Sequence, residues 1–283
     1  MDLADREPLL QQFPLIAKPF LRPVYRTSRG TLLLTTEGGL LEVVEGKVTR
    51  SPLQQVPAFQ DREIRVLLED RQGRAWIHTV DPENRSALFT FSGGRAEEFR
   101  LPPGVRADRV RLMLEDRQGN IWLTGNEAGL ARYRNGNFQV YGRSNGLLAD
   151  LNYVYALTED REGNIWLGTN NGLVRYSGER FVLFGSTEER GGESINALFE
   201  DSQGRVWIGN SAGEVIRYAD GRETVLLPAS TSPIGRLNGL VELTDGAFLL
   251  ATHHGIWRYS GQGLENVSQQ YGIMPTTQVS GIS

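Results

Sequence analysis

The sequence contains no cysteine, only three histidines and no long hydrophobic run among its 283 residues. Without cysteine the chain has no disulfide, no thiolate nucleophile and no zinc–thiolate site, and its composition is compatible with either side of a membrane. No stretch of about 18 apolar residues occurs, so we expect no membrane-spanning helix in this sequence. The first 20 residues carry acidic side chains where a signal peptide carries positive charge.

The charge balance argues against a nucleic-acid partner. The formal net charge is −4 and the isoelectric point is about 5.6, so the chain has no general basic field to hold phosphates. Hydrophobic residues make up 39% of the chain and charged residues 23%, which is typical of a globular protein. The 33 glycines exceed the usual share and indicate many tight turns. No cofactor motif is present, so none is expected.

A short phrase recurs four times with the same internal spacing. An aspartate is followed after three residues by a glycine and after six by a tryptophan, at Asp70–Gly73–Trp76, Asp116–Gly119–Trp122, Asp160–Gly163–Trp166 and Asp201–Gly204–Trp207. Weaker copies anchored at Gly30 and Gly246 carry Leu33 and Leu249 in place of tryptophan. An Arg-Tyr pair follows the tryptophan or its substitute in several copies, as at Arg132-Tyr133 and Arg175-Tyr176.

The six copies predict an all-β fold of the β-propeller class. The anchor glycines lie 43, 46, 44, 41 and 42 residues apart, a period typical of four-stranded propeller blades. The fifth copy shows the pattern, with strands expected in 194–201, 205–211, 213–220 and 222–228. No segment between the copies has sustained helical periodicity.

The expected domain organisation is a lead-in followed by one propeller. Residues 1–20 form the lead-in and could supply an outer strand, whereas residues 21–283 form the propeller. A seventh copy begins near residue 276 and is cut short, because Val279 aligns with Ile195 and Leu237. We therefore expect the amino-terminal part of a longer polypeptide and a seven-bladed ring in the full protein.

The copies "LMLEDRQGNIWLTGNEAGLARYRNGNF" and "ALTEDREGNIWLGTNNGLVRYSGERF" resemble the two-component regulator propeller repeat. The resemblance extends from about residue 20 to 283 and is strongest between about 60 and 220. It implies a periplasmic input domain of a bacterial sensor histidine kinase or hybrid two-component system, sometimes of a diguanylate cyclase. The segment would not itself be an enzyme, and its partners would be signalling domains in the same polypeptide. Any membrane attachment would lie in flanking segments.

The repeated residues are interpreted as scaffold, because a catalytic residue is needed only once. Each tryptophan is expected to fill the space between neighbouring blades, and burying an indole of about 200 Å² stabilises the fold by several kcal/mol at about 25 cal/mol per Å². Asp160 would accept backbone N–H bonds in the turn and Gly163 would supply the positive φ. The alternative, a calcium loop, lacks the glycine position and the bidentate glutamate that such a loop requires.

Function is expected where the copies differ. Eight residues before each anchor glycine, the inner strand has a polar or aromatic position where its neighbours are apolar, occupied by Arg22, Arg65, Arg111, Tyr155, Asn196 and Asn238, with Ser280 in the truncated copy. Because inner strands line the channel of a propeller, these side chains are candidates for a ligand site at the channel mouth. Arginine forks suit anionic groups and tyrosine can stack on a sugar, so the ligand would be small and polar or anionic, such as a saccharide. Asn152 and Tyr153 are weaker candidates. The alternative is a solvated channel wall in which the arginines pair with nearby acids, such as Glu69 and Glu115 on the same strands.

Two other functions compete with the sensor interpretation. A metal-dependent propeller lyase similar to the streptogramin lyases would need a histidine base, and only His78, His253 and His254 are available. We interpret these three as loop histidines and expect no bound metal, because adjacent histidines on a strand point to opposite faces. A protein-binding propeller is the third function, and a homodimer is left open.

Overall fold

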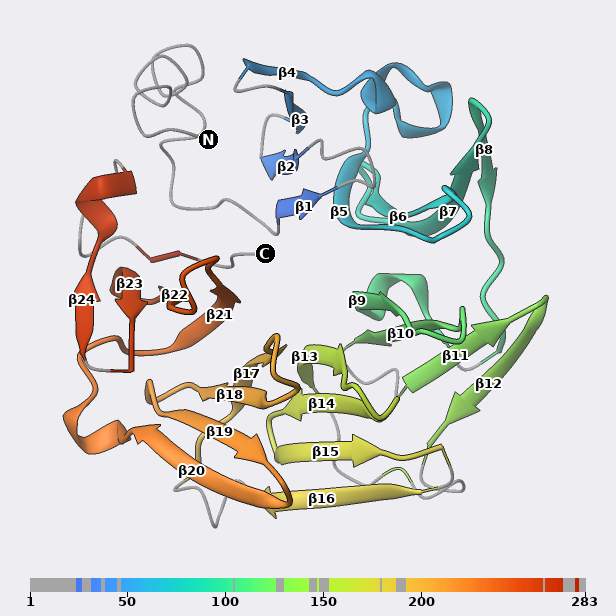
Figure 1. Cartoon of the computed structure of the whole chain (residues 1–283). Helices are drawn as coiled ribbons and strands as arrows, with labels where there is room; N and C mark the ends of the chain where they lie inside the picture. The colour runs from blue at the N-terminus through green and yellow to red at the C-terminus, as the bar shows by residue number, and fades with distance from the viewer. Residues whose placement is uncertain are drawn as a thin grey trace.

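The computed structural model of the chain describes residues 24–26, 32–36, 39–44, 47–103, 105–125, 130–142, 147, 153–178, 180–186, 192–261, 263–271 and 278–279. These residues form six four-stranded antiparallel sheets, each made of four consecutive strands. We name the sheets blade 1 to blade 6 in chain order (Figure 1). The predicted lead-in, residues 1–20, lies outside the described residues.

The strand bounds follow the repeat. Blade 1 comprises β1 (Val24–Arg26), β2 (Leu32–Thr36), β3 (Gly39–Val44) and β4 (Lys47–Arg50), and blade 2 comprises β5 (Glu63–Glu69), β6 (Ala75–Val80), β7 (Ser86–Ser92) and β8 (Arg95–Glu98). Blade 3 comprises β9 (Val110–Glu115), β10 (Ile121–Gly125), β11 (Leu130–Arg134) and β12 (Asn137–Tyr141). Blade 4 comprises β13 (Val154–Glu159), β14 (Ile165–Thr169), β15 (Gly172–Tyr176) and β16 (Phe181–Ser186). Blade 5 comprises β17 (Ile195–Glu200), β18 (Val206–Asn210), β19 (Val215–Ala219) and β20 (Arg222–Leu227), and blade 6 comprises β21 (Leu237–Glu242), β22 (Phe248–Thr252), β23 (Gly255–Tyr259) and β24 (Leu264–Asn266).

The helices of the described residues are single 3₁₀ turns in connections between blades or after the last strand. They are η3 (Pro52–Gln55), η4 (Pro57–Phe59), η5 (Ala107–Arg109), η7 (Ala229–Thr231) and η8 (Ser268–Tyr271). In the part of the chain that the structure describes, no helix is long and apolar enough to cross a membrane. The expected all-β fold is confirmed, and the four strands predicted in the fifth copy match β17 to β20 within two residues.

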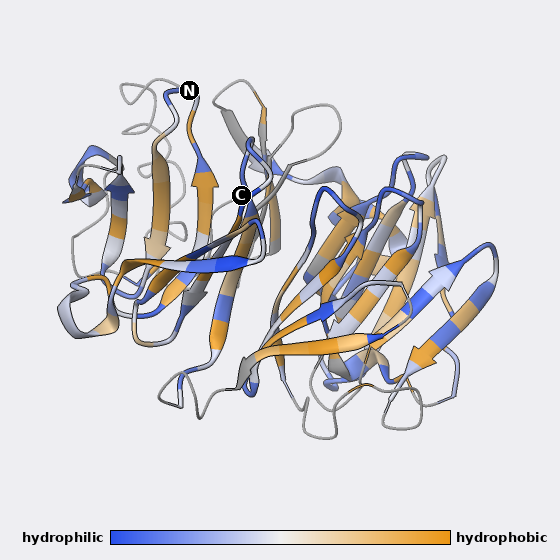
Figure 2. Cartoon of the chain, turned by 60° about the horizontal axis from the view of Figure 1, so that its bottom comes forward, coloured by the Kyte–Doolittle hydropathy of each residue, from blue (hydrophilic) through white to orange (hydrophobic). Residues whose placement is uncertain are grey.

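The blades are arranged around a common centre in chain order (Figure 1). The first strand of each blade lies nearest the centre and the fourth lies at the periphery. In blades 2 to 6 the first strands of consecutive blades lie against one another. Figure 2 shows that hydrophobic residues are concentrated along the strands and hydrophilic residues at the turns between them. The first strands therefore form the wall around the central axis.

The repeated aspartate and tryptophan form one hydrogen-bonded unit in each of blades 2 to 5. In blade 4 the Trp166 indole Nε1–H donates to Asp160 Oδ2 at 2.6 Å, while the backbone N–H of Asn164 donates to Asp160 Oδ1 at 2.8 Å. Gly163 has a φ of +83°, which an L-residue rarely adopts, so the turn requires glycine. The backbone bonds were expected from the sequence, but the bond to the indole was not. The turn therefore fixes the orientation of the tryptophan as well as that of the chain.

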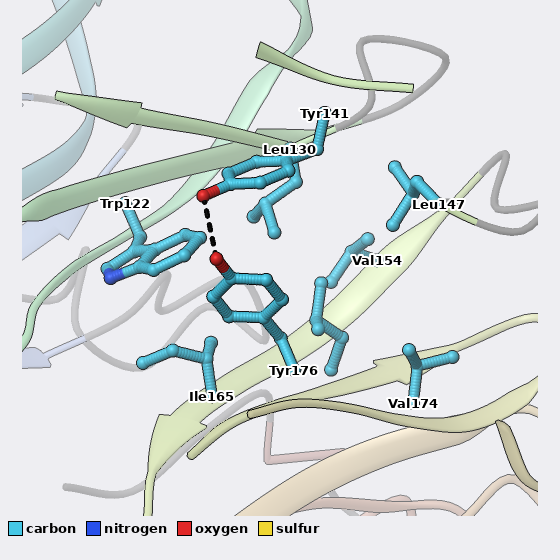
Figure 3. Close-up of a cluster of buried hydrophobic side chains, with 9 residues drawn as sticks. Trp122, Leu130, Tyr141, Leu147, Val154, Ile165, Val174 and Tyr176 are labelled. Atoms are coloured by element: carbon cyan, nitrogen blue, oxygen red, sulfur yellow. Dashed lines mark hydrogen bonds between the residues drawn. The ribbon is translucent and has the colours of Figure 1, made fainter. Parts of the chain in front are cut away.

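The tryptophans pack between blades, as the repeat predicts. Each contacts the tyrosine of the Arg-Tyr pair in the following blade, at ring-centroid distances of 5.3 Å for Trp76–Tyr133, 5.4 Å for Trp122–Tyr176, 5.1 Å for Trp166–Tyr218 and 5.8 Å for Trp207–Tyr259. Figure 3 shows the cluster between blades 3 and 4, in which the hydroxyls of Tyr141 and Tyr176 are 3.1 Å apart. The tyrosine of the Arg-Tyr pair therefore also packs between blades.

A second set of contacts joins the blades at the Asp-x-x-Gly turns. The residue after each repeat aspartate donates its backbone N–H to a glutamate at the end of the next blade's first strand, in Arg71–Glu115 (2.8 Å), Arg117–Glu159 (2.8 Å), Arg161–Glu200 (2.6 Å) and Ser202–Glu242 (2.7 Å). The Arg117 guanidinium also donates to the Asp160 carbonyl at 2.5 Å. Burial raises the pKa of the Glu159 carboxyl, although Arg117 acts against this effect. Neighbouring blades are thus joined through side chains as well as through apolar packing.

Candidate functional site

The variable position of the sequence coincides with a β-bulge in blades 2 to 6. In blade 4, Val154 pairs with Thr169 and Ala156 pairs with Gly168, so Tyr155 has no partner across the ladder. The same interruption leaves out Arg65, Arg111, Asn196 and Asn238. A bulge takes one residue out of the pairing and re-aims its side chain. The five residues therefore occupy one equivalent position near the start of five adjacent inner strands.

The bulge residue is more exposed than the residue before it. The residue before each bulge is buried, with at most 4% of its surface exposed, at Ile64, Val110, Val154, Ile195 and Leu237. The bulge residues are half-buried or exposed. Arg22 and Ser280, the equivalents predicted in the first and seventh copies, lie outside the described residues. The structure thus brings five of the six predicted site residues to the same place on consecutive blades, while a role in binding a ligand stays a prediction.

The arginine in blade 2 is held by an acidic neighbour. Arg65 Nη2 and Nε lie 2.9 and 3.1 Å from Glu63 Oε2 on the same strand. The channel-wall alternative expects the arginines to pair with acids on their own strands, and Arg65–Glu63 is a pair of this kind. Glu115 accepts the backbone N–H of Arg71. The position of Arg65 is thus fixed by Glu63, which lies two residues earlier on the same side of the strand.

Two tyrosines of blade 4 form an exposed aromatic pair. The rings of Tyr153 and Tyr155 are nearly parallel, with an interplanar angle of 7° and centroids 6.2 Å apart. Their exposed fractions are 37% and 40%, whereas every other phenylalanine, tyrosine or tryptophan side chain whose burial the structure describes is buried or half-buried. Tyr153 was a weaker candidate by proximity, and the structure places its ring beside Tyr155. Asn152 lies outside the described residues.

The two asparagines already take part in local hydrogen bonds. Asn196 Oδ1 accepts the Ser194 hydroxyl at 3.1 Å. Asn238 Nδ2 donates to the Val279 carbonyl at 2.7 Å, so this side chain holds the segment that follows blade 6. The sequence could not reveal these bonds, because Asn238 and Val279 are far apart in the chain. The asparagines of blades 5 and 6, like Arg65 of blade 2, therefore already have partners within the chain.

His78 lies on β6, where the charges of Arg65 and Arg111 act on its imidazole. The prediction of a loop residue is wrong: His78 lies in the middle of β6 and is completely buried. Burial, then the charges of Arg65 and Arg111, lower the pKa of its imidazole from about 6.5 to about 4. The side chain is therefore neutral at pH 7. No sequence signal marked this proximity, because three strands from two blades create it.

The other two histidines lie in the turn between β22 and β23. The rings of His253 and His254 are exposed and their centroids are 5.3 Å apart, so they do not point to opposite faces as expected of a regular strand. His254 Nδ1 lies 2.9 Å from the Pro233 carbonyl oxygen. Among the described residues, no group of three or more histidine, aspartate or glutamate side chains is arranged to hold a metal ion.

The ring of four-stranded antiparallel blades, with inner strands around a common axis, defines a β-propeller. The two-component regulator propeller family matches residues 150–171 and 190–212, which cover the first two strands of blades 4 and 5. These two segments are therefore repeats of that family. No curated protein matches the chain.

Solved structures agree with this fold. The extracellular domain of a protein described as a hybrid two-component system from B. thetaiotaomicron matches with a TM-score of 0.71 and 19% identity, over 93% of this chain and 35% of that chain. Virginiamycin B lyase from Staphylococcus aureus matches with a TM-score of 0.65 and 15% identity, over 89% of this chain and 85% of the lyase. This chain thus spans about a third of the first structure. At these identities the likeness establishes the propeller fold alone.

Proposed function

We propose that this chain is the ligand-sensing propeller of a bacterial signal-transduction protein of the two-component type. The observation that carries the proposal is the shared bulge, which presents side chains of different chemistry at one position of an otherwise repeated structure. The position carries arginine, tyrosine or asparagine, whereas the residue before it is a buried apolar side chain in each of blades 2 to 6. The ligand binds at the channel mouth, and the sensor works outside the cytoplasm.

The chemistry of the position favours a small polar or anionic ligand. Arg65 and Arg111 offer planar forks to a carboxylate or sulfate. Tyr153 and Tyr155 offer nearly parallel, exposed rings on which a flat apolar surface, such as one face of a saccharide, can stack. Binding across blades 2, 3 and 4 would bias how these blades pack, and signalling domains in the same polypeptide would read that change.

Ligand binding can be tested by thermal unfolding with a panel of oligosaccharides and small organic acids, followed by equilibrium dialysis of the hits. A true ligand raises the melting temperature of the unmodified protein, because it binds only the folded state. Arg111→Gln and Tyr155→Leu should each weaken its affinity at least about tenfold, as the loss of one charge-assisted bond or one stacked ring predicts. Arg222→Gln, on the exposed outer strand β20, is the matched control and should bind normally.

The proposal fails under two combined observations. These are that no panel member stabilises the protein, and that Arg65→Ala and Arg111→Ala leave signalling by the full-length protein intact. In that case the bulge position is a solvated channel wall.

A lyase is the second candidate, favoured by the structural likeness to virginiamycin B lyase and by the paired rings of His253 and His254. Its chemistry would require a divalent metal and a histidine base. An elimination assay on a streptogramin with Mg²⁺, repeated with His254→Ala, tests it. Activity that the substitution abolishes would favour the enzyme over the sensor.

A protein-binding platform is the third candidate. Leu183 on β16 and Val225 on β20 are exposed at equivalent positions of neighbouring outer strands. The partner could be a second copy of the chain. Leu183→Asp with Val225→Asp would abolish a dimer held by this surface, as sedimentation velocity would show, whereas an unchanged sedimentation coefficient would remove the candidate.

A further inference from the structure

The residue two positions before each bulge is a second variable position at the channel mouth. Blades 2 to 6 carry there Glu63, Arg109, Tyr153, Ser194 and Arg236. Blades 4 to 6 also share a backbone hydrogen bond at this position, which runs from the N–H of the residue directly after the second strand to the carbonyl oxygen. Its N···O distances are 3.2 Å for Asn170–Tyr153, 3.0 Å for Ser211–Ser194 and 2.9 Å for His253–Arg236. The backbone at Arg236 is therefore placed as it is in the two preceding blades.

The side chain at this second position lies beside the bulge residue. The two are in contact in blades 2, 4 and 5, in Glu63–Arg65 (2.9 Å), Tyr153–Tyr155 (ring centroids 6.2 Å apart) and Ser194–Asn196 (3.1 Å). Residues two apart in an extended chain project to the same side, with Cα atoms about 6 to 7 Å apart. In blade 6 the corresponding neighbours are Arg236 and Asn238.

Arg236 brings a positive charge to the mouth of the channel. Its side chain is exposed, and among the described residues none forms a hydrogen bond or an ion pair with its guanidinium. Arg65 differs, because it forms an ion pair with Glu63 on the same strand. A guanidinium is a planar fork of donors that matches the two oxygens of a carboxylate. Arg236 is thus a cationic fork that a ligand can reach.

Asn238 offers the opposite hydrogen-bonding character. Its Nδ2 donates to the Val279 carbonyl oxygen at 2.7 Å. Because a carbonyl oxygen can only accept, this bond fixes which end of the amide faces Val279. The other end, Oδ1, is an acceptor that makes no hydrogen bond with a described residue, and the side chain is half-buried. The group that complements Oδ1 is a donor such as a hydroxyl.

We propose that Arg236 and Asn238 are specificity-determining residues of the channel mouth and that they recognise a hydroxycarboxylic acid. The carboxylate of the ligand accepts hydrogen bonds from the Arg236 guanidinium, and a hydroxyl on a neighbouring carbon donates to Asn238 Oδ1. The inference rests on the proposed function, because Asn238 occupies one of the bulge positions of that site. It narrows the ligand from a polar or anionic molecule to one that carries both groups side by side.

Three small probes that differ by one group test this pair. Lactate carries a carboxylate and an adjacent hydroxyl, lactamide has a neutral amide in place of the carboxylate, and propionate lacks the hydroxyl. Each is titrated at pH 7 and constant ionic strength into the isotope-labelled full chain, and the backbone NMR signals of residues 236–239 are followed. Lactate should bind at least about fivefold more tightly than either of the other two probes, because each of them lacks one of the two interactions.

Substitutions assign each preference to one residue. Arg236→Gln should remove the preference for lactate over lactamide and leave the melting temperature of the free protein unchanged, because the guanidinium has no described partner to lose. Asn238→Ala should remove the preference for lactate over propionate, and we expect it to fold because it loses a single hydrogen bond. Arg222→Gln, on the exposed strand β20, is the control and should keep both preferences.

The inference is overturned if lactate does not bind, if all three probes bind equally, or if both preferences survive in Arg236→Gln and Asn238→Ala. The proposed function is judged separately by the panel of oligosaccharides and organic acids. A panel ligand whose affinity falls in Tyr155→Leu but not in Arg236→Gln supports the channel-mouth site and contradicts the role of Arg236. Conversely, lactate binding with the expected preferences, in a protein that no panel member stabilises, would support the pair and leave the sensor proposal without support.

Discussion

At the scale of single residues, the buried aspartate of each repeat connects the turn to the tryptophan. Asp201 is 2% exposed, and its carboxylate accepts the Trp207 indole at 2.8 Å and the Arg205 backbone and guanidinium at 2.9 and 2.5 Å. Burial alone would raise the pKa of Asp201, but these hydrogen bonds together hold it below its usual 3.8. The pKa of Asp70 is lowered in the same way.

Asp201→Asn should lower the free energy of unfolding by about 2 to 4 kcal/mol at pH 7, because the amide removes the charge and leaves one of these donors unsatisfied. Urea unfolding followed by tryptophan fluorescence measures the loss. Asp220→Asn is the matched control: Asp220 is exposed and has a φ of +51°, which asparagine also adopts. Equal stability of the two variants would show that the carboxylate is dispensable.

The same carboxylates predict an acid limit to stability. Because their pKa is lower in the folded state, their contribution is fully present above about pH 3.8 and is lost as the pH falls through the folded-state value. Unfolding curves recorded between pH 5 and pH 2 should therefore show a smaller decline in Asp201→Asn than in the unmodified chain. Parallel curves would contradict the assignment.

At the scale of elements, the close approach of neighbouring blades depends on a glycine at one equivalent position of the second strand in blades 4 and 5. Gly209 on β18 lies directly against Leu237 of blade 6, and Gly168 lies against Ile195 of blade 5. Blade 2 departs from this pattern at His78, where η5 precedes the facing strand β9. At blades 4 and 5 this position thus has no room for a side chain.

Gly209→Ala should destabilise the protein by about 1 to 3 kcal/mol, because the added methyl group overlaps Leu237 and forces blades 5 and 6 apart. The melting temperature of the variant measures the effect. Gly263→Ala is the control, since a Cβ there meets no atom within 4 Å. A double variant with Leu237→Ala should recover part of the loss, and no recovery would place the strain elsewhere.

At the scale of the whole molecule, the segment after blade 6 continues the packing pattern of the ring. The residue before each bulge packs in the cluster of the preceding blade's tryptophan position, as Leu237 does beside Trp207. Val279 packs in the same way beside Leu249, and its backbone N–H donates to the Thr252 carbonyl at 2.9 Å. The seventh copy stays a prediction, because apart from residues 278–279 it lies outside the described residues.

Val279→Ser should lower stability by about 1 to 2 kcal/mol through lost apolar burial, and Asn238→Ala by about 1 kcal/mol through its lost bond to the Val279 carbonyl. The two effects should be less than additive, because both act through the same anchored segment. Chemical denaturation of the single and double variants provides the cycle. Full additivity would mean that Asn238 does not hold this segment.

Much of the fold could be predicted from the sequence because the propeller repeats its packing. Blades 2 to 5 use the same turn and the same tryptophan against the next blade, so the phrase ending in Trp166 or Trp207 recurs at a nearly fixed period and reveals the strands. The variable position could be found for the same reason, since Arg65, Arg111 and Tyr155 stand out against apolar neighbours. The β-bulge at this position cannot be recognised from the sequence of one strand, because a bulge is defined by how two strands pair.

The sequence by itself therefore determined the architecture, the blade boundaries and the positions where a ligand site was to be sought. Only the tertiary structure decided which side chains meet: that Asn238 holds Val279, that Tyr153 lies beside Tyr155, and that His78 is completely buried in β6. The physical reason is that local order follows from short-range periodicity, whereas these contacts join separate turns or strands whose distances are set by how neighbouring blades pack.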